Sequence, residues 1–135
     1  MTIGQLAREA GVNLETVRFY ERKGLMPRPA RRPSGYREYA PEAARRIRFI
    51  RRAKELGFSL REVGELLRLR VDPRRSCADV KRQAEAKLAD IEGKLRELRH
   101  MKVALKKLAS ECTGRGPTSQ CPLLDALEAV EKKRK

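Results

Sequence analysis

The chain has 135 residues, and its 33 Lys and Arg against 18 Asp and Glu give a formal net charge of +15 at pH 7. This excess predicts a polyanionic partner, with nucleic acid as the first candidate, and most of it lies in residues 1–75. No apolar run approaches the roughly 18 residues needed to span a bilayer, and no signal-peptide pattern is found, so we expect a cytoplasmic protein without a membrane partner. A single His and the lack of a Gly-rich phosphate loop argue against an enzyme.

Two short helices joined by a turn are predicted in residues 1–26. The capping pair of Thr2 and Gln5 begins the first helix, which Gly11 ends, and Asn13 can cap the second. This is the pattern of a helix-turn-helix, in which the second helix enters the major groove of DNA.

Polar residues on the outer face of the second helix are expected to contact DNA. We expect Arg18 and Arg22 to neutralise phosphates, and Asn13 or Thr16 to contact base edges. Tyr20 either contacts DNA or packs in the core, and the sequence leaves both open.

Helix breakers between Pro27 and Pro41 surround an alternating, strand-like stretch, which predicts a basic loop or wing. Tyr36 and Arg37 of this segment are expected to contact the neighbouring DNA backbone. Pro41 is then predicted as the first residue of a third helix.

The third helix is expected to end at Gly57, and the capping pair of Ser59 and Glu62 predicts the start of a fourth. The Arg-rich run in residues 45–52 is either a contact surface or a solvated helix face. Residues 1–70 are therefore predicted to form a winged helix-turn-helix DNA-binding domain.

A long helix is predicted from Cys77 to about residue 110, preceded by a linker, within a dimerisation segment of residues 71–111. Its seam alternates steps of four and three, which is the heptad period of a coiled coil. The seam residues are Ala84, Leu88, Ile91, Leu95, Leu98, Lys102, Leu105 and Ala109. A chain this short cannot bury the seam by itself, and we therefore expect a homodimer. The series of predicted helices indicates a mainly α fold.

The three cysteines Cys77, Cys112 and Cys121 are the candidate metal ligands. Within one chain the helix would separate the first two by roughly 50 Å, too far to share an ion. In an antiparallel dimer Cys77 would meet the other two cysteines of the partner, in a register where facing residue numbers sum to about 189 and the seam residues pair. A parallel pair would gather like cysteines, which suits zinc or a disulfide, and the sequence does not exclude it.

The donor set indicates a soft metal ion. Unpaired N–H groups at helix starts favour the thiolates of Cys77 and of Cys121, which precedes a final helix beginning at Pro122. Residues 112–135 are predicted to form a metal-binding loop and C-terminal helix, yet the loop offers no His, Asp or Glu as the fourth ligand that zinc usually takes. Three thiolates suit Hg(II) best, then Pb(II), Cd(II) and As(III). Three unrelated thiols in an intracellular protein are the alternative.

Several motifs resemble the MerR family of bacterial transcription regulators. They are Ile3-Gly-Gln-Leu-Ala, Gly11-Val, Thr16-Val-Arg-Phe-Tyr-Glu, Lys23-Gly-Leu, Gly35-Tyr-Arg and Leu56-Gly-Phe-Ser-Leu. The spacing of Cys77, Cys112 and Cys121-Pro122 further resembles the family's mercury sensors, which bind Hg(II) through three cysteines, one of them from the partner subunit.

This resemblance implies an Hg(II)-responsive regulator of a metal-resistance operon, with a winged helix-turn-helix domain and an antiparallel dimerisation helix. It would repress without metal and, with Hg(II) as inducer, distort promoter DNA so that RNA polymerase can open it. The two-fold dimer predicts an inverted-repeat operator. Lead and cadmium sensors of the family often carry extra tail ligands, and residues 123–135 contain no Cys or His. A Pb(II) or Cd(II) sensor and a thiol redox-sensing or architectural DNA-binding protein remain the alternatives.

Overall fold

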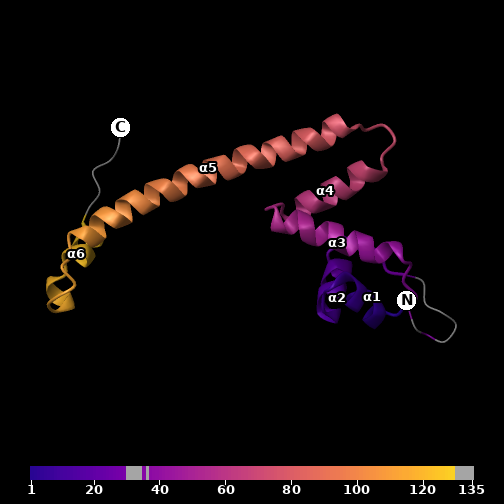
Figure 1. The fold of residues 1–135 in the computed structure, drawn as a ribbon, viewed down its shortest axis with the longest axis horizontal. Coiled ribbons are helices and arrows are strands. Elements are labelled where there is room, and N and C mark those ends of the chain that lie inside the picture. Colours follow the sequence, from indigo (N-terminus) through magenta and orange to yellow (C-terminus); the bar gives the residue numbers. More distant parts are fainter. Residues whose placement is uncertain (30–34, 36, 130–135) are drawn as a thin grey trace. The chain divides into compact units, whose positions relative to one another are not determined.

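The computed structural model describes residues 1–29, 35 and 37–129. Over this part of the chain the fold is mainly helical, as the sequence predicts (Figure 1). In chain order the helices are α1 (Ile3–Ala10), α2 (Leu14–Arg22), α3 (Glu42–Glu55), α4 (Leu60–Val71), α5 (Cys77–Ser110), the 3-10 helix η1 (Thr118–Gln120) and α6 (Pro122–Glu128). The chain divides into two compact units, Met1–Lys87 and Leu88–Lys135, and α5 passes through both.

The helix-turn-helix consists of α1 and α2, and both predicted caps are present. Thr2 and Gln5 form a complete capping box at the start of α1, and Asn13 Oδ1 accepts a hydrogen bond of 2.8 Å from the backbone N–H of Thr16. Gly11 ends α1 with a φ of 72°, in the left-handed region that a glycine adopts without strain. The turn is therefore fixed by two helix caps and a glycine, all of which can be recognised in the sequence.

The helices α1 to α4 enclose one hydrophobic core. Its fully buried side chains are Leu6, Val17, Ile47, Ile50 and Val63. From α3, Arg51 Nη1 donates to the carbonyl oxygens of Ala10 at 3.3 Å and Gly11 at 3.1 Å, so α3 also holds the end of α1. Together these contacts fix α2, the predicted DNA-contacting helix, against its neighbours.

Two sequence predictions in this unit differ from the structure in detail or lie outside it. Pro41 precedes α3 as its N-cap instead of being its first residue, although its backbone is already helical. Residues 30–34 and Tyr36 of the predicted wing lie outside the described residues, and Arg37 of the same segment forms an isolated β-bridge.

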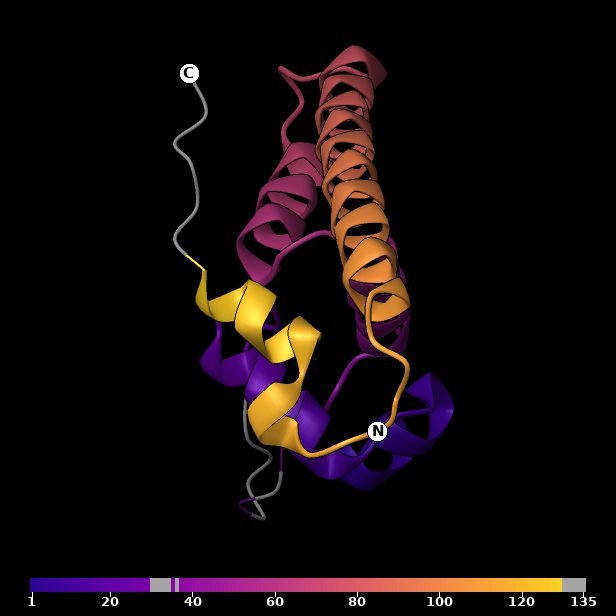
Figure 2. The ribbon, with the colours of Figure 1, turned by 90° about the vertical axis from the view of Figure 1, so that its left-hand side faces the viewer.

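The turn between α3 and α4 is joined to the first turns of α5. Ser59 and Glu62 form the predicted capping box of α4, and Lys87 Nζ of α5 lies 2.8 Å from Glu62 Oε1. Figure 2 shows α4 beside the first turns of α5. At the start of α5, the backbone N–H of Ser76 donates to Asp79 Oδ2 at 3.0 Å, as the S-x-x-D pattern predicts.

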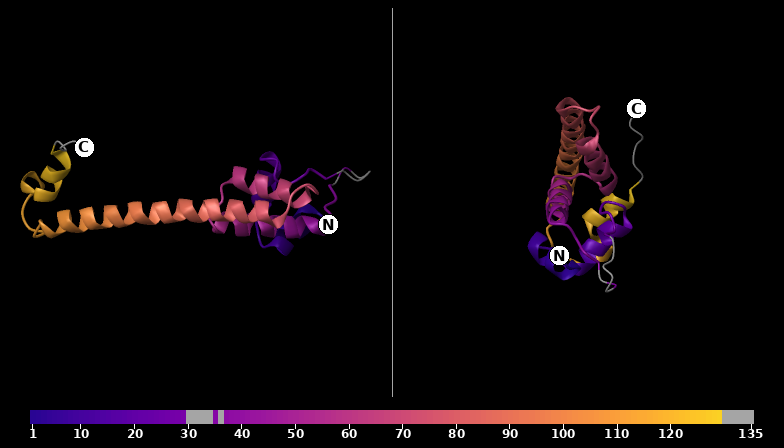
Figure 3. Two further views of the ribbon diagram at one scale, coloured as in Figure 1. Left: turned by 90° about the horizontal axis from the view of Figure 1, so that it is seen from above. Right: turned by 90° about the vertical axis from the view of Figure 1, so that its right-hand side faces the viewer.

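Figure 3 shows α5 as one continuous helix. From Leu88 onward this helix carries its apolar seam unburied. The exposed fractions are 56% for Leu88, 38% for Ile91, 46% for Leu95 and 58% for Leu98. An apolar stripe of this length on one helix face is normally covered by another surface. Its exposure in the single chain supports the prediction that a second chain covers it.

The stability of the first unit is expected to depend on pH through Glu62. The hydrogen bond from Lys87, followed by that from the Ser59 backbone N–H, lowers the pKa of Glu62 from its ordinary 4.5 to about 2. Because the folded state has the lower pKa, this stabilisation is present above pH 4.5 and is lost as the pH falls toward 2. We expect Glu62→Gln to lower the free energy of unfolding at pH 7, with urea denaturation as the measurement.

The difference between wild type and Glu62→Gln should shrink steadily across that acidic range. The exposed carboxylate of Glu55 provides the control substitution, Glu55→Gln. A difference for Glu62→Gln that stays constant down to pH 2 would contradict the role given to its ionised form.

Candidate metal centre and nucleic-acid interface

Cys112 and Cys121 are brought together by the loop between α5 and α6. The backbone N–H of Gly114 donates to Cys112 Sγ at 3.4 Å, and Gly114 and Gly116 both adopt positive φ angles that turn the chain back. The 3-10 helix η1, which the sequence did not predict, then leads to Cys121. Cys112 lies close enough to Cys121 to lower the pKa of its thiol, and both residues are half-buried.

The start of α6 favours the thiolate form of Cys121. The backbone N–H of Leu124, and less strongly that of Leu123, lowers the pKa of this thiol, although no N-cap hydrogen bond to it forms. Cys112 acts in the same direction, whereas partial burial and the charge of Asp125 raise the pKa. The net effect is a lowered pKa, as expected for a cysteine at a helix start.

Cys77 is the first residue of α5 and is exposed. A 34-residue helix separates it from the loop that holds the other two cysteines, and such a helix is about 50 Å long. Among the residues described for this single chain, no three His, Cys, Asp or Glu side chains gather as a metal site. One chain therefore supplies a pair of neighbouring thiols and, at the other end of α5, a solitary third.

The predicted DNA-contacting residues at α2 differ in whether their side chains are exposed and in whether they are already bonded within the protein. Asn13 Oδ1 also accepts from Thr16 Oγ1 at 2.9 Å, so both side chains are engaged in the cap. Arg18 forms an exposed ion pair with Glu15 at 2.9 Å, and such surface pairs exchange easily for another anion. Tyr20 is buried in the core, only 8% exposed, and this burial raises the pKa of its hydroxyl.

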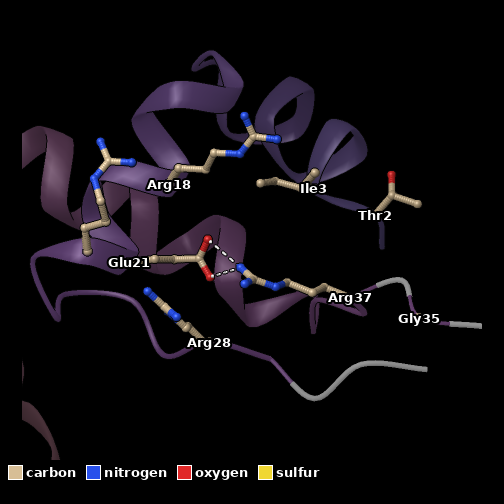
Figure 4. Close-up of a pocket in the computed structure, with 8 residues that line it drawn as sticks. Thr2, Ile3, Arg18, Glu21, Arg28, Gly35 and Arg37 are labelled. Atoms are coloured by element: carbon tan, nitrogen blue, oxygen red, sulfur yellow. Dashed lines mark hydrogen bonds and ion pairs between the residues drawn. The ribbon is translucent and has the colours of Figure 1, made fainter. Parts of the chain in front are cut away.

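Four arginines line a cavity of about 500 Å³ beside α2: Arg18, Arg22, Arg28 and Arg37. Figure 4 shows Arg18, Arg28 and Arg37 at this cavity. Its floor holds Glu21, whose side chain is only 3% exposed. Arg37 Nη1 lies 3.2 Å from one carboxylate oxygen of Glu21, and the hydroxyl of Tyr39 donates to the other at 3.1 Å. Arg37 is thus tied to a buried acid, and the other three arginines give the cavity its net positive charge.

The sequence analysis did not identify Glu21 as a residue of this cavity, although its position in α2 indicates a buried acid. It lies four residues after the buried Val17, on the inner face of α2, where an acid needs a cationic or hydrogen-bonding partner. The partner, Arg37, is 16 residues away, and no local pattern marks that contact.

None of the described helices is both long and apolar enough to cross a bilayer. The two family models that match the chain are MerR HTH family regulatory protein, over residues 1–69, and MerR, DNA binding, over residues 44–108. The mercuric resistance operon regulatory protein of Serratia marcescens is 41% identical over 99% of this chain and 92% of its own length. The regulator CueR of Salmonella typhimurium is 40% identical over 94% of this chain and 91% of its own length.

Two solved structures of metal-bound regulators are also similar. The transcription regulator PbrR691 from Ralstonia metallidurans, in complex with lead(II), has a TM-score of 0.85 and 36% identity, covering 94% of this chain and 98% of its own. The regulator MerR from Bacillus megaterium, in complex with the mercury(II) ion, has a TM-score of 0.73 and 34% identity, covering 96% of this chain and 100% of its own. The present chain therefore belongs to the MerR family of helix-turn-helix regulators, and it is a metal-responsive transcription regulator.

Proposed function

We propose that this regulator responds to Hg(II), bound by Cys112 and Cys121 of one subunit and Cys77 of the other in an antiparallel dimer. The observation that carries the proposal is the thiol pair after α5, with the third cysteine at the opposite end of the same helix. Thiolates without imidazole or carboxylate form the donor set that a soft, thiophilic ion prefers.

The exposed seam of α5 supports the antiparallel register. When facing residue numbers sum to about 189, Leu95 lies near its own copy, Ile91 faces Leu98, and Leu88 faces Met101. All of these apolar side chains are exposed in the single chain. The same register brings Cys77 to Cys112, so one arrangement buries the seam and completes the site.

The chemistry of the pair also fits. Hg(II) binds thiolates, and the lowered pKa of Cys121 raises the fraction of that thiol ready to bind at neutral pH. Cys77 would supply the third thiolate from the exposed first turn of α5. The half-burial of Cys112 and Cys121 would limit access of competing ligands from water.

A Pb(II) or Cd(II) sensor of the same family is the second candidate, because a lead-bound relative shares this fold closely. Residues 123–135 contain no Cys or His for an additional ligand, which favours Hg(II). A thiol that senses oxidants, or an architectural DNA-binding role, is the other alternative. Titrating the reduced protein with Hg(II), Pb(II), Cd(II) and Zn(II) and following thiolate-to-metal charge-transfer absorption tests the proposal: Hg(II) should bind most tightly, and tighter binding of another ion would overturn the mercury assignment.

In the proposed mechanism the dimer binds an inverted-repeat promoter and represses it without metal. Metal binding favours a second dimer geometry that distorts the promoter and allows RNA polymerase to open it. An ion that bound both geometries equally would shift nothing, so the site must be better formed in the activating geometry. A site built from two subunits meets this requirement, because its three sulfurs change their spacing whenever the subunits move.

The arginines of the cavity beside α2 are expected to contact DNA phosphates. Arg22→Ala should weaken binding to an operator selected from random-sequence duplexes, and it should reduce the slope of log affinity against log salt by about two, one contact for each subunit. Fluorescence anisotropy over a series of salt concentrations measures both quantities.

The matched control is Arg61→Ala, since the Arg61 side chain is 89% exposed on α4, outside this cavity. It should leave the salt dependence unchanged. An unchanged slope for Arg22→Ala would remove Arg22 from the interface, and equal wild-type affinity for scrambled DNA would favour the architectural alternative.

A further inference from the structure

Lys87 is the buried residue of α5, only 8% exposed in a helix whose other described residues are at least partly exposed. A buried ammonium group is costly unless it is paired. Its Nζ lies 2.8 Å from Glu62 Oε1 and 5.7 Å from the centre of the Phe58 ring. These partners all belong to the turn between α3 and α4 and the first turn of α4.

Glu62 takes part in two interactions, the ion pair with Lys87 and the capping box of α4. Its Oε1 also accepts a hydrogen bond of 2.8 Å from the backbone N–H of Ser59, which is half of the capping box that begins α4. The neighbouring Phe58 is part of the core formed by α1 to α4. A displacement of Lys87 would therefore act on the start of α4 and on a core side chain at once.

The remaining surface between α4 and α5 is open. A cleft of about 540 Å³ is lined by residues of both helices, including Leu69 and Ala86, and by Arg75 of the linker between them. At its side Gln83 donates a hydrogen bond of 3.4 Å to Glu65. The angle of α5 here is set by polar contacts and by the contacts of Lys87, without a continuous apolar interface.

We propose that the Lys87–Glu62 ion pair is the contact through which metal binding changes the geometry of the DNA-binding helices. The inference rests on the proposed function, because Cys77, a proposed ligand, begins the helix that carries Lys87 ten residues later. Those residues form about three helical turns, which move as one rigid piece. A shift of Cys77 on metal binding then moves Lys87, and Lys87 moves the α3–α4 turn through Glu62 and Phe58.

The test uses the full-length chain and the variant Lys87→Met, which keeps an apolar stem over Phe58 and removes the charge. Three quantities are measured: Hg(II) affinity by charge-transfer absorption, metal-free affinity for the selected operator, and the Hg(II)-induced fluorescence change of 2-aminopurine at the operator centre. We expect the first two within about threefold of wild type, and the third reduced about fivefold or more.

Lys81→Met is the matched control, because Lys81 is an exposed lysine of the same helix. It should keep the full fluorescence change. Lys87→Arg keeps the charge and should restore at least about half of the change, which a purely apolar packing role of the stem would not require.

The outcomes separate the two proposals. If wild type fails to bind Hg(II), the proposed function is wrong. Normal Hg(II) binding with a full fluorescence change in Lys87→Met overturns only the role proposed for the Lys87–Glu62 ion pair. Failure of Lys87→Arg to restore the change also overturns it. If circular dichroism shows that Lys87→Met does not fold, Glu62→Gln replaces it, with the same expected loss of the fluorescence change. A full fluorescence change in Glu62→Gln again overturns the role proposed for the ion pair.

Discussion

Replacing Cys77 by serine is expected to weaken Hg(II) binding about a hundredfold or more, as severely as Cys112→Ser. The reason is that a serine hydroxyl is a hard, neutral ligand, so either change leaves a soft ion with two thiolates. The equal effect is informative, since Cys77 stands at the far end of α5 from the other cysteines. Competition titrations against a small dithiol, followed by charge-transfer absorption, measure the loss.

The metal-free affinity for the operator is the internal control for these variants. It should stay near the wild-type value in both, because neither cysteine belongs to the first four helices. Full Hg(II) binding retained by Cys77→Ser would reduce the site to the Cys112–Cys121 pair. Loss of operator binding in either variant would instead point to a folding defect.

Leu95→Glu is expected to dissociate the dimer, weakening self-association about a hundredfold or more. In the proposed register Leu95 lies at the crossing point near its own copy, so the substitution would bury two facing carboxylates. Like charges in a desolvated interface repel strongly and lack water to solvate them. Sedimentation equilibrium measures the association, and circular dichroism verifies that the helices persist.

Val103→Glu is the matched control, since Val103 is an apolar residue of α5, 69% exposed and off the seam. It should leave the dimer intact. Leu95→Glu should also lose Hg(II) binding and most operator affinity, because both require two subunits in the proposed mechanism. A Leu95→Glu protein that remains a tight dimer would place the interface elsewhere on the chain.

The elements that the sequence predicts well are those fixed by neighbouring residues. The capping boxes at Thr2 and Ser59 are present in the structure because each depends on side chains three residues apart. The core positions follow helical spacing for the same reason. The short 3-10 helix Thr118–Gln120 was missed because one turn has too few residues to show a period.

Contacts between distant residues were not predictable in this way. The pairing of Glu21 with Arg37, and of Glu62 with Lys87, joins helices whose mutual position depends on the whole core. The sequence analysis groups Cys112 and Cys121 as ligands of one ion, and this grouping stays a prediction. The place of Cys77 in the site remains a prediction, since it depends on a second chain.

Mixed dimers test most directly whether the metal site is shared between subunits. Chains carrying Cys77→Ser are refolded together with chains carrying both Cys112→Ser and Cys121→Ser, and Hg(II) binding is titrated under reducing conditions. A shared site predicts that neither variant alone binds tightly, whereas each mixed dimer regains one complete set of three thiolates and binds one ion. No recovery of tight binding in verified mixed dimers would contradict the shared site and, with it, the antiparallel arrangement.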